Sequence, residues 1–145
     1  MKLERIKKEF KPVWQAKKGH GSFLTFDMGE KIERTYETKA GSYLVGSEHL
    51  WIYMCQWKLL KGDRLLLDSQ TIDGAKDCEK ILASLVGSRI TSIGLSEETV
   101  EIFFSNGIKL ELFASCDQED EMFILYEEGQ PTISYYPTNG LVAED

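Results

Sequence analysis

The sequence predicts an α+β domain in which a mostly antiparallel β-sheet, curled or in two layers, is packed by one main helix. Short runs of aromatic and aliphatic residues recur along the chain between glycines, as is typical of antiparallel strands. Residues 73–86 instead carry apolar side chains at helical spacing. The last third of the chain alternates apolar and polar residues in consecutive runs, which predicts a C-terminal β-meander.

Length and composition predict a single globular domain over residues 1–145. A chain of 145 residues with 42% hydrophobic and 28% charged residues can bury a core of its own. No apolar run approaches the length of a membrane span, and the basic N-terminus lacks the apolar segment of a secretory signal. Three widely spaced cysteines, Cys55, Cys78 and Cys116, favour reduced thiols, and therefore a cytoplasmic protein without a membrane partner.

The first element is the basic N-terminal segment, residues 1–18, which carries seven Lys or Arg against Glu4 and Glu9. Its apolar residues Leu3, Ile6 and Phe10 lie at helical spacing. The spacing predicts a short amphipathic helix that ends before Pro12.

Two strands are predicted next. Residues 21–29, "GSFLTFDMG", are bracketed by glycines and place Leu24, Phe26 and Met28 on one face. The aromatic stretch "SEHLWIYMCQWKL" contains neither Gly nor Pro and predicts a central strand over residues 48–57. Both faces of that strand are mostly apolar, which predicts that both are covered.

The same stretch holds a histidine and a cysteine, which raises the possibility of a catalytic pair. In an extended strand His49 and Cys55 share a face but lie about 20 Å apart. A Cys–His pair needs hydrogen-bond contact at about 3 Å. The stretch is therefore interpreted as a core strand with a buried, structural Cys55.

The main helix is predicted to begin near Asp73, whose carboxylate can cap it, and to end at Gly87 in a left-handed conformation. One face carries the apolar residues Cys78, Ile81, Leu82, Leu85 and Val86.

The register of the meander follows from its loops. A three-residue loop, Ser105–Gly107, with Gly107 in a left-handed bulge position, pairs Ile102 with Leu110 and Val100 with Leu112. The turn at residues 96–99 then pairs Leu95 with Val100 and Ile93 with Ile102. On the opposite face, Glu101 lies across from Glu111 and beside Gly94, and Phe103 lies across from Lys109.

Charge is distributed unevenly along the chain. The net charge is −7, and residues 93–145 hold twelve acidic side chains against Lys109 alone. One interpretation is a solvated acidic surface that aids solubility. The other is a surface that binds a basic protein partner. The residues predicted to bind that partner are Glu101, Phe103, Glu111, Asp117, Glu119, Asp120 and Glu121.

Motifs for catalysis and for cofactors are absent from the sequence. It contains no Walker loop, no dinucleotide-binding glycine motif and no zinc-ligand spacing. The acidic run "CDQEDE" lacks the spacing and the glycine of a calcium loop. We therefore expect no metal, no cofactor and a non-enzymatic protein. The alternative is a small-ligand-binding or hydrolytic domain that uses the aromatic interior with His20, His49 and Cys55. Nucleic-acid binding is disfavoured because the chain is acidic.

The segments "GSFLTFDMG", "HLWIYMCQW" and "LVGSRITSI…VEIFFSNGIKLELF" resemble segments of small, single-domain bacterial proteins of unknown function. Some of those proteins are regarded as immunity proteins that neutralise a cognate toxin. The resemblance spans about residues 20 to 115 and consists of strand and turn patterns. It implies a cytosolic inhibitor that occludes a basic toxin domain through an acidic face, and it carries over no functional residue.

Overall fold

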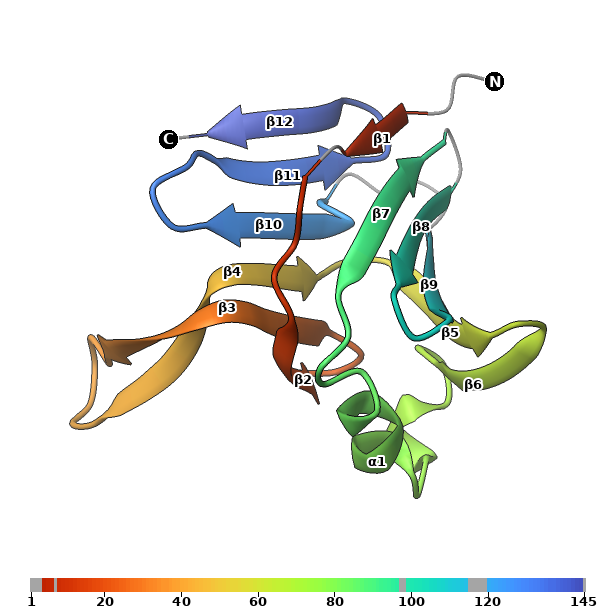
Figure 1. Cartoon of the computed structure of the whole chain (residues 1–145), viewed down its shortest axis with the longest axis horizontal. Helices are drawn as coiled ribbons and strands as arrows, with labels where there is room; N and C mark the ends of the chain where they lie inside the picture. Colours follow the sequence, from red (N-terminus) through yellow and green to blue (C-terminus); the bar gives the residue numbers. More distant parts are fainter. Residues whose placement is uncertain (1–3, 7, 97–98, 115–119, 145) are drawn as a thin grey trace.

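In the computed structural model, which describes residues 4–6, 8–96, 99–114 and 120–144, the chain forms two antiparallel β-sheets (Figure 1). Sheet A contains, in spatial order, β1 (Glu4–Ile6), β7 (Ile90–Leu95), β8 (Thr99–Phe104), β9 (Ile108–Phe113), β5 (Gln56–Lys61) and β6 (Arg64–Asp68). Sheet B contains β12 (Gly140–Glu144), β11 (Thr132–Tyr136), β10 (Phe123–Glu127), β4 (Ser42–Ile52), β3 (Leu24–Thr35) and β2 (Val13–Lys18).

The two sheets enclose the hydrophobic core between their inner faces. The predicted alternation in the first strand is confirmed, because Leu24, Phe26 and Met28 of β3 are all fully buried. Trp57 of β5 is the largest buried side chain, and its indole Nε1 donates a hydrogen bond to the carbonyl of Ser22 at 2.7 Å. Sheet A thereby contacts the loop that precedes β3.

The predicted central strand over residues 48–57 is wrong in extent. β4 ends at Ile52, and the chain passes through Tyr53–Cys55 into β5 of the other sheet (Figure 1). Leu50 and Ile52 face the core in β4, Cys55 faces it in the connection, and Trp57 faces it in β5. The residues that face the core are thus even-numbered before the crossing and odd-numbered after it. Two successive strands, each buried on one face only, therefore give the same sequence pattern as one long strand buried on both faces.

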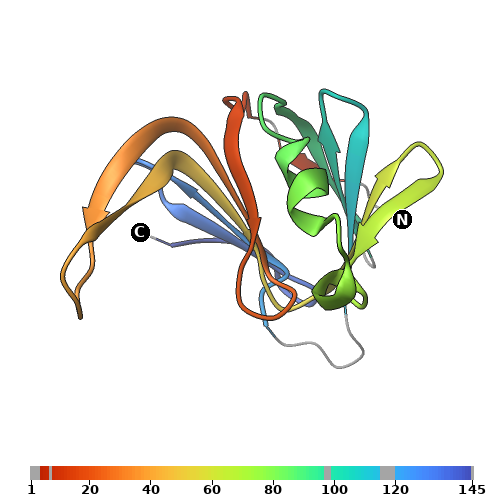
Figure 2. The same cartoon turned by 90° about the horizontal axis from the view of Figure 1, so that it is seen from below.

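The predicted α+β class is also wrong, because the structure contains little helix in its described part. The predicted helix over residues 73–86 is reduced to a 3₁₀ turn, η1 (Ile72–Gly74), and the six-residue α1 (Cys78–Ala83). Asp73 does not cap a helix but forms an exposed ion pair with Lys18. A helix of six residues is too short to cover a sheet. It instead lies between β2 of sheet B and β6 of sheet A (Figure 2). Neither it nor η1 has the length and apolarity that a membrane span needs.

The register predicted for residues 93–112 is confirmed. Ile102 pairs with Leu110, Val100 with Leu112, and Glu101 with Glu111. Leu95 pairs with Val100 and Ile93 with Ile102 across the preceding turn. Gly107 has φ of 88° and Gly87 has φ of 90°, so both adopt the predicted left-handed conformation. The three strands after residue 120 form a second meander, β10–β12, which belongs to sheet B.

The N-terminal helix predicted within residues 1–18 is wrong. β1 pairs with β7, and Phe10 is buried as the chain crosses to β2. Nζ of Lys8 donates hydrogen bonds to the carboxylates of Glu48 and Glu127. Glu48, which is 3% exposed, also accepts the backbone N–H of Lys11 at 2.8 Å. Strand pairing and this ion network, both long-range, override the helical spacing of the sequence.

Candidate functional site

The face of sheet B that points away from sheet A carries both aromatic and acidic side chains, and we call it the outer B face. Alternation along β4 buries Leu50 and Ile52 and turns His49 and Trp51 outward. In register, Trp51 lies between Thr25 of β3 and Ile124 of β10. The inward alternation of apolar residues thus places the aromatic residues of β4 on the outer face.

Three half-buried aromatic rings form a cluster at one end of the outer B face. The ring centroids of Trp51 and Tyr53 are 4.6 Å apart. Phe23 lies 6.0 Å from Trp51 and 4.9 Å from Tyr53, with tilted or edge-on rings. These geometries are favourable for aromatic pairs. The cluster is therefore a preorganised apolar contact surface that remains partly open to solvent.

An aspartate–histidine pair lies beside this cluster. Oδ1 of Asp27 is 2.7 Å from Nδ1 of His49 and 3.0 Å from the backbone N–H of Gly46. Asp27 is 2% exposed, so its carboxyl group orients the imidazole ring of His49 from within the protein. Nε2 of His49 is then left for another partner. Within the described residues, no serine or cysteine side chain forms a hydrogen bond with His49.

The β3–β4 hairpin bends beyond Gly29 and Gly46 and curves over the outer B face (Figure 2). Its residue Arg34 donates hydrogen bonds to the hydroxyl of Tyr126 at 3.2 Å and to the carboxylate of Glu128 at 3.0 Å. Tyr126 in turn donates to Glu128 at 2.8 Å, and this hydrogen bond raises the pKa of its phenol. The hairpin is thereby fastened to β10 beside His49, the register partner of Tyr126.

Carboxylates gather around Tyr136 at the end of β11. Its phenol forms a hydrogen bond with Glu121, which is the main cause of a raised pKa. The negative charges of Glu121, Glu144 and Asp120 act in the same direction. Three carboxylates thus produce a negative potential around one half-buried tyrosine ring.

The structure separates the residues predicted to bind a partner. Asp120 and Glu121 lie at sheet B, close to Tyr136. Glu101, Phe103 and Glu111 lie on the outer face of sheet A, which points away from sheet B (Figure 2). Asp117 and Glu119 fall outside the described residues, as does Cys116.

The opposed glutamates on sheet A are balanced by neighbouring cations. Nζ of Lys109 is 3.1 Å from Glu101 and 3.8 Å from Glu111, and it lies over the ring of Phe103 at 5.9 Å from the centroid. Lys58 is the register partner of Glu111 on the adjoining strand. This arrangement favours the outer B face over the outer face of sheet A as the acidic surface.

The residues of the alternative site are not brought together. Cys55 belongs to the core, where its Sγ donates to the carbonyl of Met122, whereas the His49 side chain lies on the outer B face. His20 is exposed in the turn between β2 and β3 and contacts the edge of Phe23. Burial raises the pKa of the Cys55 thiol to about 12, so it is protonated at neutral pH. No Cys–His dyad forms from these three residues.

Cys55 is expected to react very slowly with thiol reagents in the native protein. A pKa that rises from 9.0 to about 12 makes the thiolate at pH 8 roughly 1,000-fold scarcer than in the unfolded chain. We expect at least that retardation when labelling by iodoacetamide is followed at Cys55 by peptide mass spectrometry, with the urea-unfolded protein as the control. Equal labelling rates in the two states would contradict the burial of this thiol.

Sequence reasoning missed Asp27, Tyr126 and Tyr136, and assigned Trp51 to a strand covered on both faces. The signal for Tyr126 and Tyr136 lay in the alternation of β10 and β11, which turns them outward. No local pattern pairs Asp27 with a histidine 22 positions later.

Comparison of the chain with protein-family models, curated proteins and solved structures finds no significant match. Within the described residues, no group of three or more His, Cys, Asp or Glu side chains is arranged to hold a metal ion. Function is therefore inferred from the chain's own geometry.

Proposed function

We propose that this chain is a cytosolic, non-enzymatic protein-binding module, most concretely an immunity-type inhibitor that covers a basic toxin domain with its outer B face. The observation that carries the proposal is the cluster of Phe23, Trp51 and Tyr53 on a sheet face that also holds the carboxylates around Tyr136. An apolar anchor beside charged side chains matches the anatomy of protein interfaces, in which a polar rim surrounds an apolar centre.

The aromatic cluster supports the choice of a protein ligand. Trp and Tyr are the residue types that most often dominate binding energy at interfaces, because each offers a large, stiff surface with a polar edge. Trp51 and Tyr53 hold each other in place, so little side-chain freedom is lost when a partner covers them.

The charge distribution supports a basic partner. Residues 93–145 carry twelve carboxylates against one lysine, and Glu121 and Glu144 from this stretch lie around Tyr136. A surface of this kind accelerates association with a positively charged protein and repels acidic ones. A toxin that acts on nucleic acid has a basic site, which an acidic inhibitor can occlude.

A small-ligand-binding or hydrolytic domain is the second candidate, and the Asp27–His49 hydrogen bond is the observation that favours it. A carboxylate that orients a histidine is a common arrangement for a general base. Asp27, however, also accepts the N–H of Gly46 at the bend of the hairpin, which gives it a structural task. The second candidate predicts that a small molecule binds near His49 and shifts the NMR resonances of its imidazole ring.

The decisive experiment compares equal charge changes on opposite faces. The partner is first captured from a native bacterial lysate and identified by mass spectrometry, and its affinity is then measured by calorimetry. The double variant Glu121→Gln/Glu144→Gln alters the outer B face, and Glu101→Gln/Glu111→Gln is the matched control on sheet A. We expect at least a tenfold loss of affinity in the first variant, no loss in the second, and an association rate that falls as salt rises.

The variant Tyr136→Ala tests the aromatic contribution at a half-buried position of the outer B face. Thermal unfolding of each variant shows whether its fold is retained. A partner whose affinity is indifferent to salt and to changes on the outer B face would overturn the proposal. Equal losses from both double variants would also overturn it, because they would mean a general charge effect without a defined surface.

A further inference from the structure

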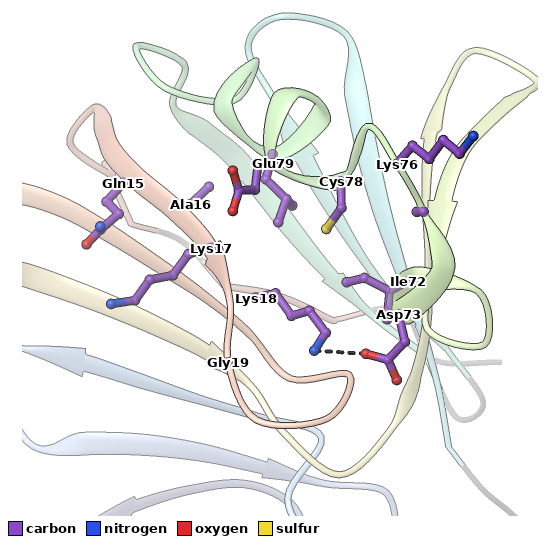
Figure 3. A pocket seen from close by; sticks show the side chains of 12 residues that line it. Gln15, Ala16, Lys17, Lys18, Gly19, Ile72, Asp73, Lys76, Cys78 and Glu79 are labelled. Carbon is purple, nitrogen blue, oxygen red and sulfur yellow. Dashed lines mark ion pairs between the residues drawn. The ribbon is translucent and has the colours of Figure 1, made fainter.

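The edge of sheet B formed by β2 borders a groove that the outer B face does not include (Figure 3). β2 forms one wall, and η1 with α1 forms the other. The groove has a volume of about 760 Å³, within the range of protein ligand sites, roughly 300–1,000 Å³. The side chains of Ile72 and Cys78 point into it, and an ion pair between Lys18 and Asp73, at 2.9 Å, crosses its mouth (Figure 3).

The backbone of β2 offers hydrogen-bonding groups to this groove. β2 is the last strand of sheet B and pairs with β3 alone. In an antiparallel pair, alternate residues direct their N–H and C=O groups toward and away from the partner strand. The N–H of Gly19 donates to the carbonyl of Phe23 across the hairpin, so the N–H of Gly19 points toward β3 and the alternation is counted back from this residue. The N–H and C=O groups of Ala16 and Lys18 therefore point away from β3, toward the groove.

The chain itself already pairs with the start of this edge. The N–H of Gly87 donates to the carbonyl of Val13, and the N–H of Val13 donates to the carbonyl of Ser88, both at 2.8 Å. The turn after α1, in which Gly87 has φ of 90°, thus lies against the edge of β2 through two backbone hydrogen bonds. The edge therefore already binds backbone groups at Val13. It presents the same kind of groups again beyond the bulge at residues 13–15, at Ala16 and Lys18.

We propose that the β2 edge binds an extended segment of a partner protein by strand addition, through backbone hydrogen bonds to Ala16 and Lys18. Ala16 packs against the core, so the partner residue opposite it points toward the groove floor at Ile72 and Leu82 and is apolar. Lys17 is exposed on the other face and favours an acidic residue opposite it. The bound segment therefore alternates apolar and acidic residues.

The ion pair at the mouth of the groove does not prevent this mode of binding. The Asp73 side chain is 78% exposed, and the Lys18 side chain is 31% exposed. Exposed ion pairs contribute little to stability, so a strand that enters the groove displaces this one easily. Strand addition is a recurrent mode of peptide recognition because unpaired edge groups are complementary to any extended backbone.

The test uses a blocked synthetic hexapeptide that alternates Glu and Val, with the intact protein. Amide hydrogen exchange is followed residue by residue by NMR. At saturating peptide we expect exchange of the Ala16 and Lys18 amide protons to slow at least tenfold. The matched control is the same peptide with N-methyl groups on alternate residues, which removes the donors that pair with β2 and should give no protection.

The variant Ala16→Pro removes one edge donor at a position where an edge strand tolerates proline. Peptide binding should be lost while the thermal unfolding midpoint stays near that of the wild type. Should Ala16→Pro fail to fold, the N-methylated peptide still decides the outcome. The proposal is overturned if the N-methylated peptide binds equally well or if neither Ala16 nor Lys18 is protected. The outer-face variant Glu121→Gln/Glu144→Gln should retain full protection, because the two surfaces are independent.

Discussion

Replacing Gly46 with alanine is expected to destabilise the fold strongly. A Cβ atom at this position would lie 2.4 Å from the carbonyl oxygen of Met28, 2.5 Å from the Met28 nitrogen and 2.5 Å from the carbonyl oxygen of Glu48. All three are backbone atoms, so no side chain can rotate away to relieve the overlap. Gly46 is also the residue whose N–H binds Asp27 where the β3–β4 hairpin bends. The clash would therefore separate β3 from β4.

We expect Gly46→Ala to cost more than about 4 kcal/mol, which is a large part of the stability of a typical domain. Urea denaturation followed by tryptophan fluorescence measures the free energy of unfolding. The matched control is Gly74→Ala, because a Cβ atom there meets nothing within 4 Å. That control should change stability by about 1 kcal/mol or less. A Gly46→Ala protein as stable as the control would contradict the close approach of β3 and β4.

The second large effect concerns the ion network of Lys8, the buried Glu48 and the partly exposed Glu127. Replacing Lys8 with methionine leaves Glu48 buried without its cation. Removal of one partner from a buried ion pair costs about 3–5 kcal/mol, because the remaining charge is neither solvated nor paired. The backbone N–H of Lys11 still binds Glu48 in this variant, so we expect a loss at the lower end of that range.

Urea denaturation again provides the measurement, and Lys11→Met is the matched control. Lys11 is exposed and contacts Glu48 through its backbone N–H, which methionine retains. The control should therefore lose less than about 0.5 kcal/mol. Equal losses in the two variants would mean that the positive charge of the N-terminal segment matters but the Lys8 network does not.

The Lys8 network also predicts a dependence on pH. Burial lowers the pKa of Lys8, but its hydrogen bonds to Glu48 and Glu127 outweigh this, and the folded pKa is raised above the ordinary 10.5. A raised pKa stabilises the folded state fully at pH values below 10.5, and this stabilisation is lost as pH rises through the folded value. The difference in unfolding free energy between wild type and Lys8→Met should therefore be constant at neutral pH and shrink above 10.5.

The Lys8 network also shows that the N-terminal segment is a structural part of the fold. The spacing of its apolar residues predicted a short amphipathic helix, whereas the structure uses Arg5 in strand pairing with β7 and Lys8 as the partner of a buried carboxylate. A segment that contributes both a strand and a buried charge is part of the fold. Its basic character therefore has a structural explanation that requires no nucleic acid.

The elements that the sequence alone determined are those set by local geometry. Alternation identified the buried face of β3, because side chains of an extended chain point to opposite sides whatever surrounds them. The loop at Gly107 set the register of β8 and β9, because loop length and a left-handed glycine permit one pairing. The opposition of Glu101 and Glu111 followed from that register, and it is present.

Tertiary structure alone decided where the chain changes sheets, how long the helix is and which distant side chains meet. The crossing at Tyr53–Cys55 depends on backbone hydrogen bonds to Glu121 and Met122, which lie almost seventy positions later. The pairing of Asp27 with His49 and the placing of carboxylates around Tyr136 likewise join segments that have no local influence on each other. The sequence pattern shows only which side chains are apolar and become buried. Which side chains contact one another is decided when the two sheets pack around one core. Only that packing brings distant segments together, so that their buried polar groups form hydrogen bonds with each other.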